Sequence, residues 1–408
     1  MKKSVLRSYA NLIARMGVNI QPGQEVFIQA DLDQPEFVQM LVEECYKCKA
    51  RKVVVDWNYQ PLQKVHYRYR TLTTLGKVDN YEEARWQHYV DTIPCRIYLL
   101  SEDPDGLRGI NQEKMAKSRQ RQYPVIKKYR DQIENKYQWC IAAVPGEAWA
   151  KKLFPNLRKS QAVEKLWEAI LSTSRALEGD PVANWEAHNK DMQDRCAYLN
   201  GLHIRELRYK SANGTDFQVG MIPEARFCGG CERSLQGIVF NPNIPTEECF
   251  ISPMRGKAEG IVYATKPLSY QGQLIEDFWI RFREGKAVEW HADKNNELLT
   301  KLITMDEGSA YLGECALVPY DSPICQSGLL FYNTLFDENA ACHLALGMGF
   351  ADTIRGFEEK TLEECRALGV NDSMIHEDFM IGSADMCIDA VCEDGRTVPI
   401  FRDGSWAF

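Results

Sequence analysis

The first half of the chain alternates short apolar runs with longer helical stretches, and this alternation constrains the fold more than any other feature. The apolar runs are typical of strands and lie at residues 25–29, 52–56, 96–100 and 138–144. Helical patterns lie between them at 34–49 and 112–134. Strands that alternate with helices pair in parallel through crossover connections. The sequence therefore predicts a doubly wound α/β domain over residues 1–180, in which the valine-rich run at 52–56 is a buried strand.

The pattern changes after Gly179-Asp180-Pro181, which we interpret as a linker between two domains. Short strands then follow one another, with hairpin turn signals at Asn213-Gly214 and Glu284-Gly285. Helices are predicted near residues 295–304 and 343–349. We therefore expect a second domain over residues 181–408, strand-rich and of the α+β class.

Composition and motifs exclude several classes of function. No G-x-G-x-x-G fingerprint follows the first strand, so a dinucleotide-binding role is not expected. The net charge of -8 argues against binding to nucleic-acid phosphates. The N-terminus has no signal-like apolar block, and no run of about 18 apolar residues could span a membrane. The 14 cysteines are mostly scattered singly, which is typical of reduced thiols. We therefore expect a cytoplasmic protein with no nucleic-acid or membrane partner.

Five side chains able to bind a metal ion fall between residues 241 and 408. They are Glu248, Glu314, His343, His376 and Asp378. His376 and Asp378 are two residues apart in a run typical of a strand, where alternate side chains share a face. An imidazole and a carboxylate on one face suit zinc, cobalt or manganese. His343 lies in an Ala- and Leu-rich run that predicts a helix start, which Asn339 could cap. Spacing alone does not separate a metal site from structural histidines, and both interpretations stay open.

Several longer motifs resemble one known family. They lie at residues 241–248, 265–270, 313–319, 330–339, 370–373 and 399–402, and a looser likeness extends upstream through 201–207. These segments resemble the thermophilic aminopeptidase family of dinuclear metallopeptidases, which includes aminopeptidases T and S. The resemblance covers essentially the whole chain.

This resemblance implies an activity and a set of site residues. It assigns two divalent cations (zinc, cobalt, manganese or magnesium) to Glu248, Glu314, His343, His376 and Asp378. One carboxylate would bridge the two cations, and Glu248 and Glu314 would also take part in catalysis. The implied enzyme is a metalloaminopeptidase that hydrolyses N-terminal residues from short peptides with a metal-activated water. The family also implies a homodimer whose active sites open into an internal cavity.

Phe350 departs from the family pattern. The resembled enzymes carry a tyrosine seven residues after the position of His343, where it is proposed to bind the oxyanion. Phenylalanine keeps the ring but has no hydroxyl to donate a hydrogen bond. Loss of one such donor typically lowers kcat by about 10² to 10³. Three outcomes stay open: a slower peptidase, compensation by another donor such as Tyr332, or a changed activity.

Two other functions are compatible with the same residues. Ring-cleaving dioxygenases related to the family hold one iron(II) ion with two histidines and an aspartate. His343, His376 and Asp378 could form such a triad. Retention of both candidate glutamates argues for two metals instead. The third possibility is a non-catalytic, peptide-binding homologue in which Phe350 marks impaired activity.

Overall fold

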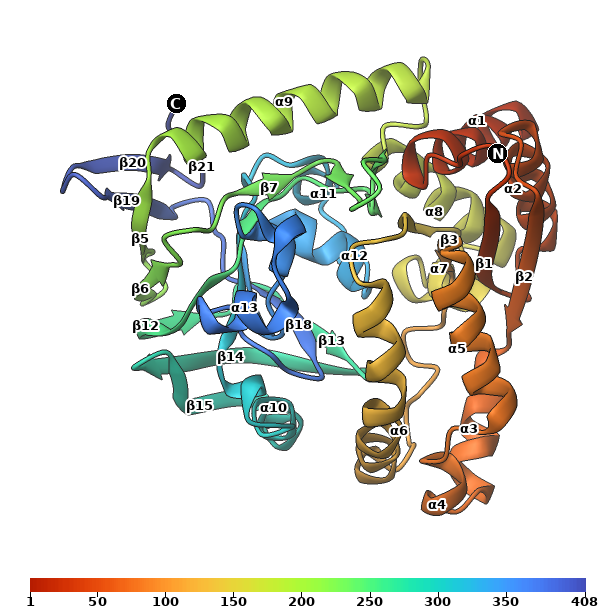
Figure 1. The fold of residues 1–408 in the computed structure, drawn as a ribbon, viewed down its shortest axis with the longest axis horizontal. Coiled ribbons are helices and arrows are strands. Elements are labelled where there is room, and N and C mark those ends of the chain that lie inside the picture. The colour runs from red at the N-terminus through yellow and green to blue at the C-terminus, as the bar shows by residue number, and fades with distance from the viewer. The chain divides into compact units, whose positions relative to one another are not determined.

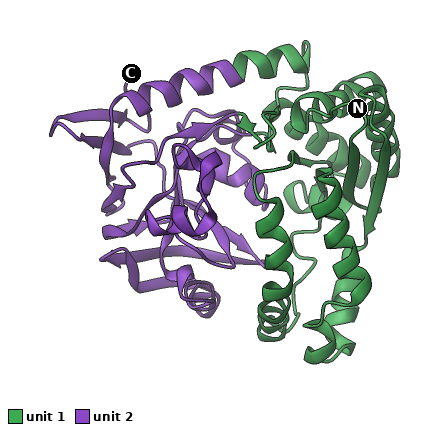
Figure 2. Cartoon of the chain, in the orientation of Figure 1, with its two compact units in different colours: residues 1–188, 231–245 green, residues 189–230, 246–408 purple.

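The computed structural model describes residues 1–408, and the chain forms two compact units. Unit 1 contains residues 1–188 and 231–245, and unit 2 contains residues 189–230 and 246–408 (Figure 2). Helix α9 (Pro181–Gly201) carries the chain from the first unit into the second. Segment 231–245 belongs to unit 1 although unit 2 supplies the chain on both sides of it. The domain boundary that we place at residue 180 stays a prediction.

Unit 1 is built on a five-stranded parallel sheet (Figure 1). Its strands lie in the order β10-β4-β3-β1-β2, and every neighbouring pair is parallel. They are β1 (Glu25–Asp31), β2 (Lys52–Asn58), β3 (Cys95–Leu100), β4 (Trp139–Ala143) and β10 (Asn243–Ile244). The first four are the strands expected from the apolar runs. Because β2 is an edge strand, its valines are only half-buried, and the prediction of a buried strand there is wrong.

The remaining elements of unit 1 are helices and one short hairpin. The helices are α1 (Lys3–Leu12) with a π-helical continuation (Ile13–Gly17), α2 (Pro35–Lys47), α3 (Gln60–Tyr69), α4 (Leu72–Leu75), α5 (Asn80–Thr92), α6 (Gln112–Ile133), α7 (Glu147–Leu153) and α8 (Lys159–Thr173). The hairpin pairs β8 (Glu232–Arg233) with β9 (Val239–Phe240). The helices of the whole chain include none with the length and apolar character that crossing a membrane requires.

Helices cover both faces of the parallel sheet. On one face, Phe27 of β1 packs edge-on against Tyr89 of α5, with ring centroids 4.9 Å apart. Val26 and Ile28 point to the opposite face because side chains alternate along a strand, and both are fully buried. The aromatic cluster that joins α1, α2 and α8 consists of Tyr9, Phe37 and Trp167. Helices on both faces define a doubly wound domain, so the predicted fold class is confirmed for this unit.

Asp31, at the end of β1, provides a test of how burial affects the stability of unit 1. Burial, followed by the charges of Glu102 and Asp33, raises the pKa of Asp31 to about 6. Its Oδ1 atom is buried and has no hydrogen-bond partner. A folded-state pKa above the unfolded value means that ionisation destabilises the fold, and this cost develops as the pH rises from about 4 to 6.

We therefore expect Asp31→Asn to raise the melting temperature at pH 8 by about 2–4 °C. This corresponds to about 1 kcal/mol, after a discount for the partial exposure of the side chain. The gain should disappear near pH 4, where the wild-type carboxyl is protonated. Calorimetry at both pH values checks this, with Glu36→Gln on the exposed face of α2 as the control. An unchanged melting temperature at pH 8 would contradict it.

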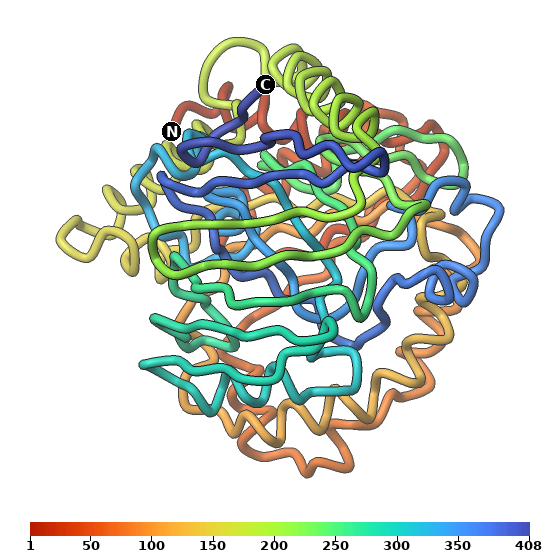
Figure 3. The backbone as a smooth tube through the Cα atoms, turned by 90° about the vertical axis from the view of Figure 1, so that its left-hand side faces the viewer, coloured from red at the N-terminus to blue at the C-terminus, as the bar shows by residue number.

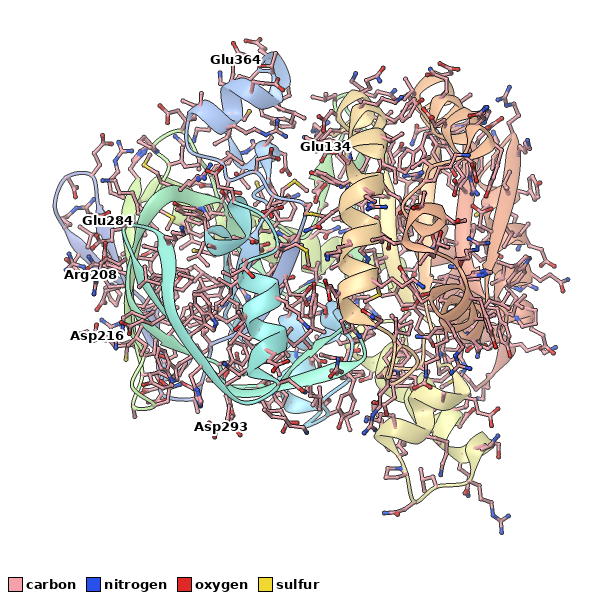
Figure 4. All side chains as sticks on the ribbon, turned by 90° about the horizontal axis from the view of Figure 1, so that it is seen from below. Glu134, Arg208, Asp216, Glu284, Asp293 and Glu364 are labelled. Atoms are coloured by element: carbon pink, nitrogen blue, oxygen red, sulfur yellow. The ribbon has the colours of Figure 1, made fainter.

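The larger sheet of unit 2 has nine strands. Its path is β13-β14-β12-β6-β5-β19-β20-β21, with β15 paired to β14, and it appears as a ladder in Figure 3. The strands are β5 (Ile204–Lys210), β6 (Asp216–Met221), β12 (Pro253–Tyr263), β13 (Leu268–Tyr270), β14 (Gln273–Arg283), β15 (Lys286–Lys294), β19 (Cys387–Cys392), β20 (Thr397–Arg402) and β21 (Ser405–Trp406). Adjacent strands are antiparallel, and hairpins turn at both predicted Asn-Gly and Glu-Gly positions. Figure 4 shows exposed polar side chains of these strands and turns directed outward, including Arg208, Asp216, Glu284 and Asp293.

A smaller antiparallel sheet completes unit 2. Its order is β18-β17-β16-β11-β7. The strands are β7 (Cys228–Gly229), β11 (Cys249–Ile251), β16 (Leu312–Leu317), β17 (His343–Gly347) and β18 (His376–Met380). Every residue of β16 and β17 is buried, so this sheet lies inside the unit. Strand-rich sheets with few helices agree with the predicted α+β class.

Short helices connect these strands. They are α10 (Asn296–Ile303), α11 (Pro323–Gln326), α12 (Thr334–Asp337) and α13 (Leu362–Ala367), with 3-10 turns at Gly308–Ala310, Glu338–Ala340, Ala351–Thr353 and Phe357–Glu359. Helix α10 confirms the prediction near residues 295–304. The prediction of a helix at 343–349 is wrong, because His343 begins β17. Strands pair with β17 on both sides, and these tertiary contacts override the helical preference of its Ala and Leu residues.

Candidate metal centre

All five candidate ligands lie on or beside the smaller sheet of unit 2. Glu314 on β16 and Asp378 on β18 both lie opposite Ala345 of β17, one strand away on each side. His343 precedes Ala345 by two residues, and His376 precedes Asp378 by two. Side chains two residues apart in a strand share a face, so these four ligands point to the same side. Ala345, which lies between them, carries only a methyl group.

Glu248, the residue just before β11, joins the same face. Phe250, two residues further along, pairs with Ala316 of β16, which in turn is two residues after Glu314. Because side chains two residues apart on a strand share a face, Glu248 points to the same side of the sheet as the other four ligands. The sequence pattern at His376 and Asp378 predicted the local pairing, whereas the register between four strands assembles the complete set.

The imidazole nitrogens lie close to the carboxylates. Nε2 of His343 is 3.0 Å from Glu248 Oε2, 3.9 Å from Glu314 Oε1 and 4.0 Å from Asp378 Oδ1. Nε2 of His376 is 3.0 Å from Glu314 Oε2 and 3.3 Å from Asp378 Oδ1. The structure thus brings all five predicted residues together, and Glu314 is near both histidines.

Backbone carbonyl groups fix the orientation of both imidazoles. Nδ1 of His376 is 2.7 Å from the carbonyl oxygen of Met348, and Nδ1 of His343 is 3.2 Å from that of Ala341. A carbonyl oxygen only accepts, so each Nδ1 carries the proton and donates it. In the neutral ring, Nε2 then presents a lone pair to the carboxylate-lined space. This arrangement is typical of histidines that ligate metals.

The donor set fits divalent cations. Nε2 of His343 and Oδ1 of Asp378 are buried without a hydrogen-bond partner, and a cation would satisfy both. Two groups of three residues have ligand atoms within 4.8 Å of one another: Glu248, Glu314 and His343 form one group, and Glu314, His376 and Asp378 form the other. Glu314 belongs to both groups, as a bridging carboxylate would. Mixed nitrogen and carboxylate ligands suit zinc, cobalt or manganese.

Burial and mutual repulsion make this cluster electrostatically unfavourable without a cation. Burial, opposed by the hydrogen bond to His376 and aided by the charges of Glu248 and Asp378, raises the pKa of Glu314 to about 7. Burial by itself would lower the pKa of His343. The adjacent Glu248 and the charges of Asp378 and Glu314 outweigh this effect and raise the pKa to about 9. The site therefore concentrates negative charge that positive groups must balance.

Glu338 is a further carboxylate at this site, which sequence reasoning missed. Burial and the charges of Asp378, Glu248 and Glu314 raise its pKa well above the ordinary range. Its carboxyl group also contacts Asp378 through a hydrogen bond. It occupies the 3-10 turn Glu338–Ala340, whose irregular backbone has no periodicity to reveal which way a side chain points. The available signal was chemical: an acidic pair followed by Asn339 and two alanines.

Phe350 lies beside the candidate ligands. Its ring centroid is 4.7 Å from that of His376 and 5.6 Å from that of Phe250. Ser252 holds its backbone, since Ser252 Oγ accepts from the Phe350 N–H at 2.8 Å. Thr353 Oγ1 donates to the Phe350 carbonyl at 2.7 Å. The ring is therefore held at the edge of the site, where it presents an apolar surface.

The chain is similar to known metallopeptidases over nearly its whole length. Residues 2–406 match the family described as thermophilic metalloprotease (M29), so the chain is a metallopeptidase by class. Aminopeptidase AmpS of Bacillus subtilis (strain 168) is 38% identical over 404 residues, which cover 99% of this chain and 98% of that protein. Aminopeptidase T of Thermus aquaticus is 36% identical over 405 residues, which cover 98% of each.

A solved structure supports the same family. Wild-type AmpT from Thermus thermophilus matches with a TM-score of 0.89 and 36% identity, over 100% of both chains. The chain belongs to the thermophilic metalloprotease (M29) family. This confirms the resemblance drawn from the sequence motifs, the fold class and the prediction of a hydrolytic enzyme.

Proposed function

We propose that the chain is an aminopeptidase that removes N-terminal residues from short peptides with two divalent cations. The observation that carries this proposal is the pair of three-residue ligand groups that share Glu314. One shared carboxylate between two nitrogen-containing groups is the arrangement that two adjacent cations need. The relatives at 36% to 38% identity are named aminopeptidases, which supports the exopeptidase activity. As for the resembled family, we propose a homodimer, and the cytoplasm stays our prediction for its location.

In this proposal, Glu248, Glu314 and His343 hold one cation, and Glu314, His376 and Asp378 hold the other. Bound cations supply Lewis acidity toward the scissile carbonyl and acidify a water nucleophile. The protein's own groups prepare the site for this chemistry. The carbonyl groups behind His343 and His376 keep both Nδ1 atoms protonated and both Nε2 atoms directed at the site. Glu338, buried beside Asp378, is available to hold a proton next to the ligand set.

Phe350 limits the rate in this proposal because it gives the site an aromatic edge without a hydroxyl donor. We expect Phe350→Tyr to raise kcat on an aminoacyl anilide by up to about 10²-fold, the reverse of the usual loss when an oxyanion donor is removed. Steady-state kinetics check the result, and the rise should appear in kcat more than in KM.

Phe350→Leu is the matched control, because it removes the ring that contacts His376 without adding a donor. It should not raise kcat. If Phe350→Tyr leaves kcat unchanged, a donor at this position plays no part in the reaction of this enzyme, and another residue such as Tyr332 becomes the candidate.

The mononuclear dioxygenase alternative is disfavoured by the surroundings of the triad. His343 and His376 each lie 3.0 Å from a glutamate oxygen, from Glu248 and Glu314 respectively. A facial triad needs its remaining coordination positions open for oxygen and substrate. Two additional carboxylates beside both histidines instead complete a second set of ligands.

The test of the proposal is metal-dependent turnover. Protein stripped with a chelator is reloaded with cobalt, zinc, manganese or magnesium, assayed on a panel of aminoacyl anilides, and analysed for bound metal. Anilide release with two metals per chain is expected. Two metals without release would point to the non-catalytic alternative. One iron per chain with oxygen uptake on a hydroxypyridine would overturn the peptidase proposal.

A further inference from the structure

Asn339 is a fully buried amide that connects two parts of the candidate metal centre. It lies in the 3-10 turn Glu338–Ala340 and is 0% exposed. The sequence suggested that it caps a helix beginning near His343, and that prediction is wrong because no helix begins there. Its hydrogen bonds run to the segments that carry two of the site carboxylates.

The oxygen of this amide holds the segment that leads into Glu248. Asn339 Oδ1 accepts from the backbone N–H of Glu247 at 2.7 Å, and both partners are buried. Glu247 is 92 residues away in the sequence and immediately precedes the candidate ligand Glu248. A shift of the Asn339 side chain would therefore displace the backbone from which Glu248 reaches His343.

The nitrogen of the same amide contacts the carboxylate of Glu338. Asn339 Nδ2 donates to Glu338 Oε1 at 3.3 Å and to the carbonyl oxygen of Leu335 at 2.9 Å. Glu338 in turn contacts Asp378, so the amide orients a carboxyl group against another candidate ligand. Both N–H donors and the oxygen of the amide are therefore in use, which fixes its orientation.

The backbone of Asn339 is held as well. Its carbonyl oxygen accepts from Ser322 Oγ at 2.9 Å, and Ser322 is itself buried. The side-chain amide is thus a rigid connection between two segments that meet only through folding. Buried, fully bonded groups behind metal ligands are typical determinants of ligand orientation.

We propose that Asn339 is a positioning residue of the metal centre: its amide fixes the Glu248 segment and the Glu338 carboxylate relative to one another. This inference rests on the proposed function, because it assumes that cations bind at Glu248, Glu314, His343, His376 and Asp378. Asn339 itself need not touch a cation or a substrate.

Asn339→Asp is the sharpest test because the two side chains have the same shape. The aspartate keeps an oxygen for the Glu247 N–H but removes both donors and places an acceptor against the Glu338 carboxylate and the Leu335 carbonyl. We expect the dissociation constant for Zn²⁺, measured by competition with a chromogenic chelator, to rise by about 10- to 100-fold. Activity should recover in part when Zn²⁺ is raised, which a merely unstable protein would not show.

Asn200→Asp is the matched control. Asn200 also donates through Nδ2 to a backbone carbonyl, that of Phe227 at 3.0 Å, and accepts the Phe227 N–H at 2.8 Å through Oδ1. It lies in the same unit but contacts none of the candidate ligands. We expect it to lower the melting temperature while leaving the Zn²⁺ dissociation constant unchanged. Asn339→Ala, which also removes the oxygen that accepts from the Glu247 N–H, should weaken Zn²⁺ binding at least as much as Asn339→Asp.

The possible results separate this inference from the proposed function. Wild-type protein that binds no Zn²⁺ at the five residues would overturn both. Wild-type protein that binds Zn²⁺ and cleaves anilides, beside an Asn339→Asp variant with the same dissociation constant and kcat, would overturn the positioning role alone. If Asn339→Asp and Asn200→Asp weaken Zn²⁺ binding equally, the effect is general destabilisation, and the inference is rejected.

Discussion

Replacement of Glu314 by glutamine is expected to abolish aminopeptidase activity, because Glu314 belongs to both ligand groups. Its two oxygens lie near different histidines, Oε1 3.9 Å from His343 Nε2 and Oε2 3.0 Å from His376 Nε2. Glutamine has one oxygen and no negative charge, so it cannot serve two cations. Removal of a single group that stabilises charge in a reaction typically lowers kcat by about 10² to 10³, and a ligand shared by two cations should cost at least that much.

The same substitution should not destabilise the metal-free protein. The pKa of Glu314 is raised to about 7, chiefly by burial and then by the neighbouring carboxylates. Its ionised form therefore opposes folding, and this cost develops as the pH rises from about 4.5 to 7. A neutral glutamine removes the cost. We expect metal-free Glu314→Gln to melt at or above the wild-type temperature at pH 8, although its activity is lost.

Glu377→Gln provides the control for both measurements. Glu377 lies between His376 and Asp378 on β18, so alternation directs its side chain to the opposite face. Its replacement should leave metal content and kcat within a few-fold of the wild type. Retention of two metals and near-normal turnover by Glu314→Gln would show that this carboxylate does not bridge cations.

The parts of the fold that could be predicted from sequence are those specified by local patterns. Apolar runs separated by helices marked the first four strands of the parallel sheet, and Asn213-Gly214 marked a hairpin. His376 and Asp378 are close in sequence, so their shared face followed from the period of a strand. In each of these cases, the information lies within a few residues of the feature that it predicts.

The parts that sequence did not reveal depend on distant segments. Strand β10 joins the sheet of unit 1 from about 100 residues beyond β4, and local pattern does not indicate that pairing. His343 occupies a strand because β16 and β18 flank it, although its own neighbours favour a helix. Glu338 and Asn339 lie in a 3-10 turn, where contacts across the unit determine what each side chain meets.

Binding of metal is expected to release protons and to stabilise the protein more strongly as the pH rises. In the metal-free state the pKa of His343 is about 9, because the adjacent Glu248 and the charges of Asp378 and Glu314 outweigh the effect of burial. The pKa of His376 is also raised well above its usual value, since Asp378 and Glu314 outweigh burial there. Protonation of both imidazoles is therefore favoured in the metal-free protein, and a cation needs their Nε2 lone pairs.

Calorimetric titration of the metal-free protein with Zn²⁺, in buffers of different ionisation enthalpy, should show release of roughly two or more protons per chain at pH 7.5. His343→Gln should release about one proton fewer, whereas His291→Gln, at an exposed histidine of β15, should change nothing. Binding with no net proton release would mean that the cation occupies a different site.

The raised pKa of His343 also determines how the stability of the metal-free protein changes with pH. A raised folded-state pKa at His343 stabilises the metal-free protein fully below about pH 6.5, and this contribution is lost as the pH rises toward 9. A cation replaces the lost positive charge, so the difference in melting temperature between loaded and stripped protein should widen from pH 6 to pH 9.

At a Zn²⁺ concentration 1,000 times the dissociation constant, binding raises the free energy of unfolding by about 4 kcal/mol. In a unit of this size, that gain corresponds to a rise of about 8–16 °C. A difference that narrows as the pH rises would show that protonated histidines do not compete with the cation for this site.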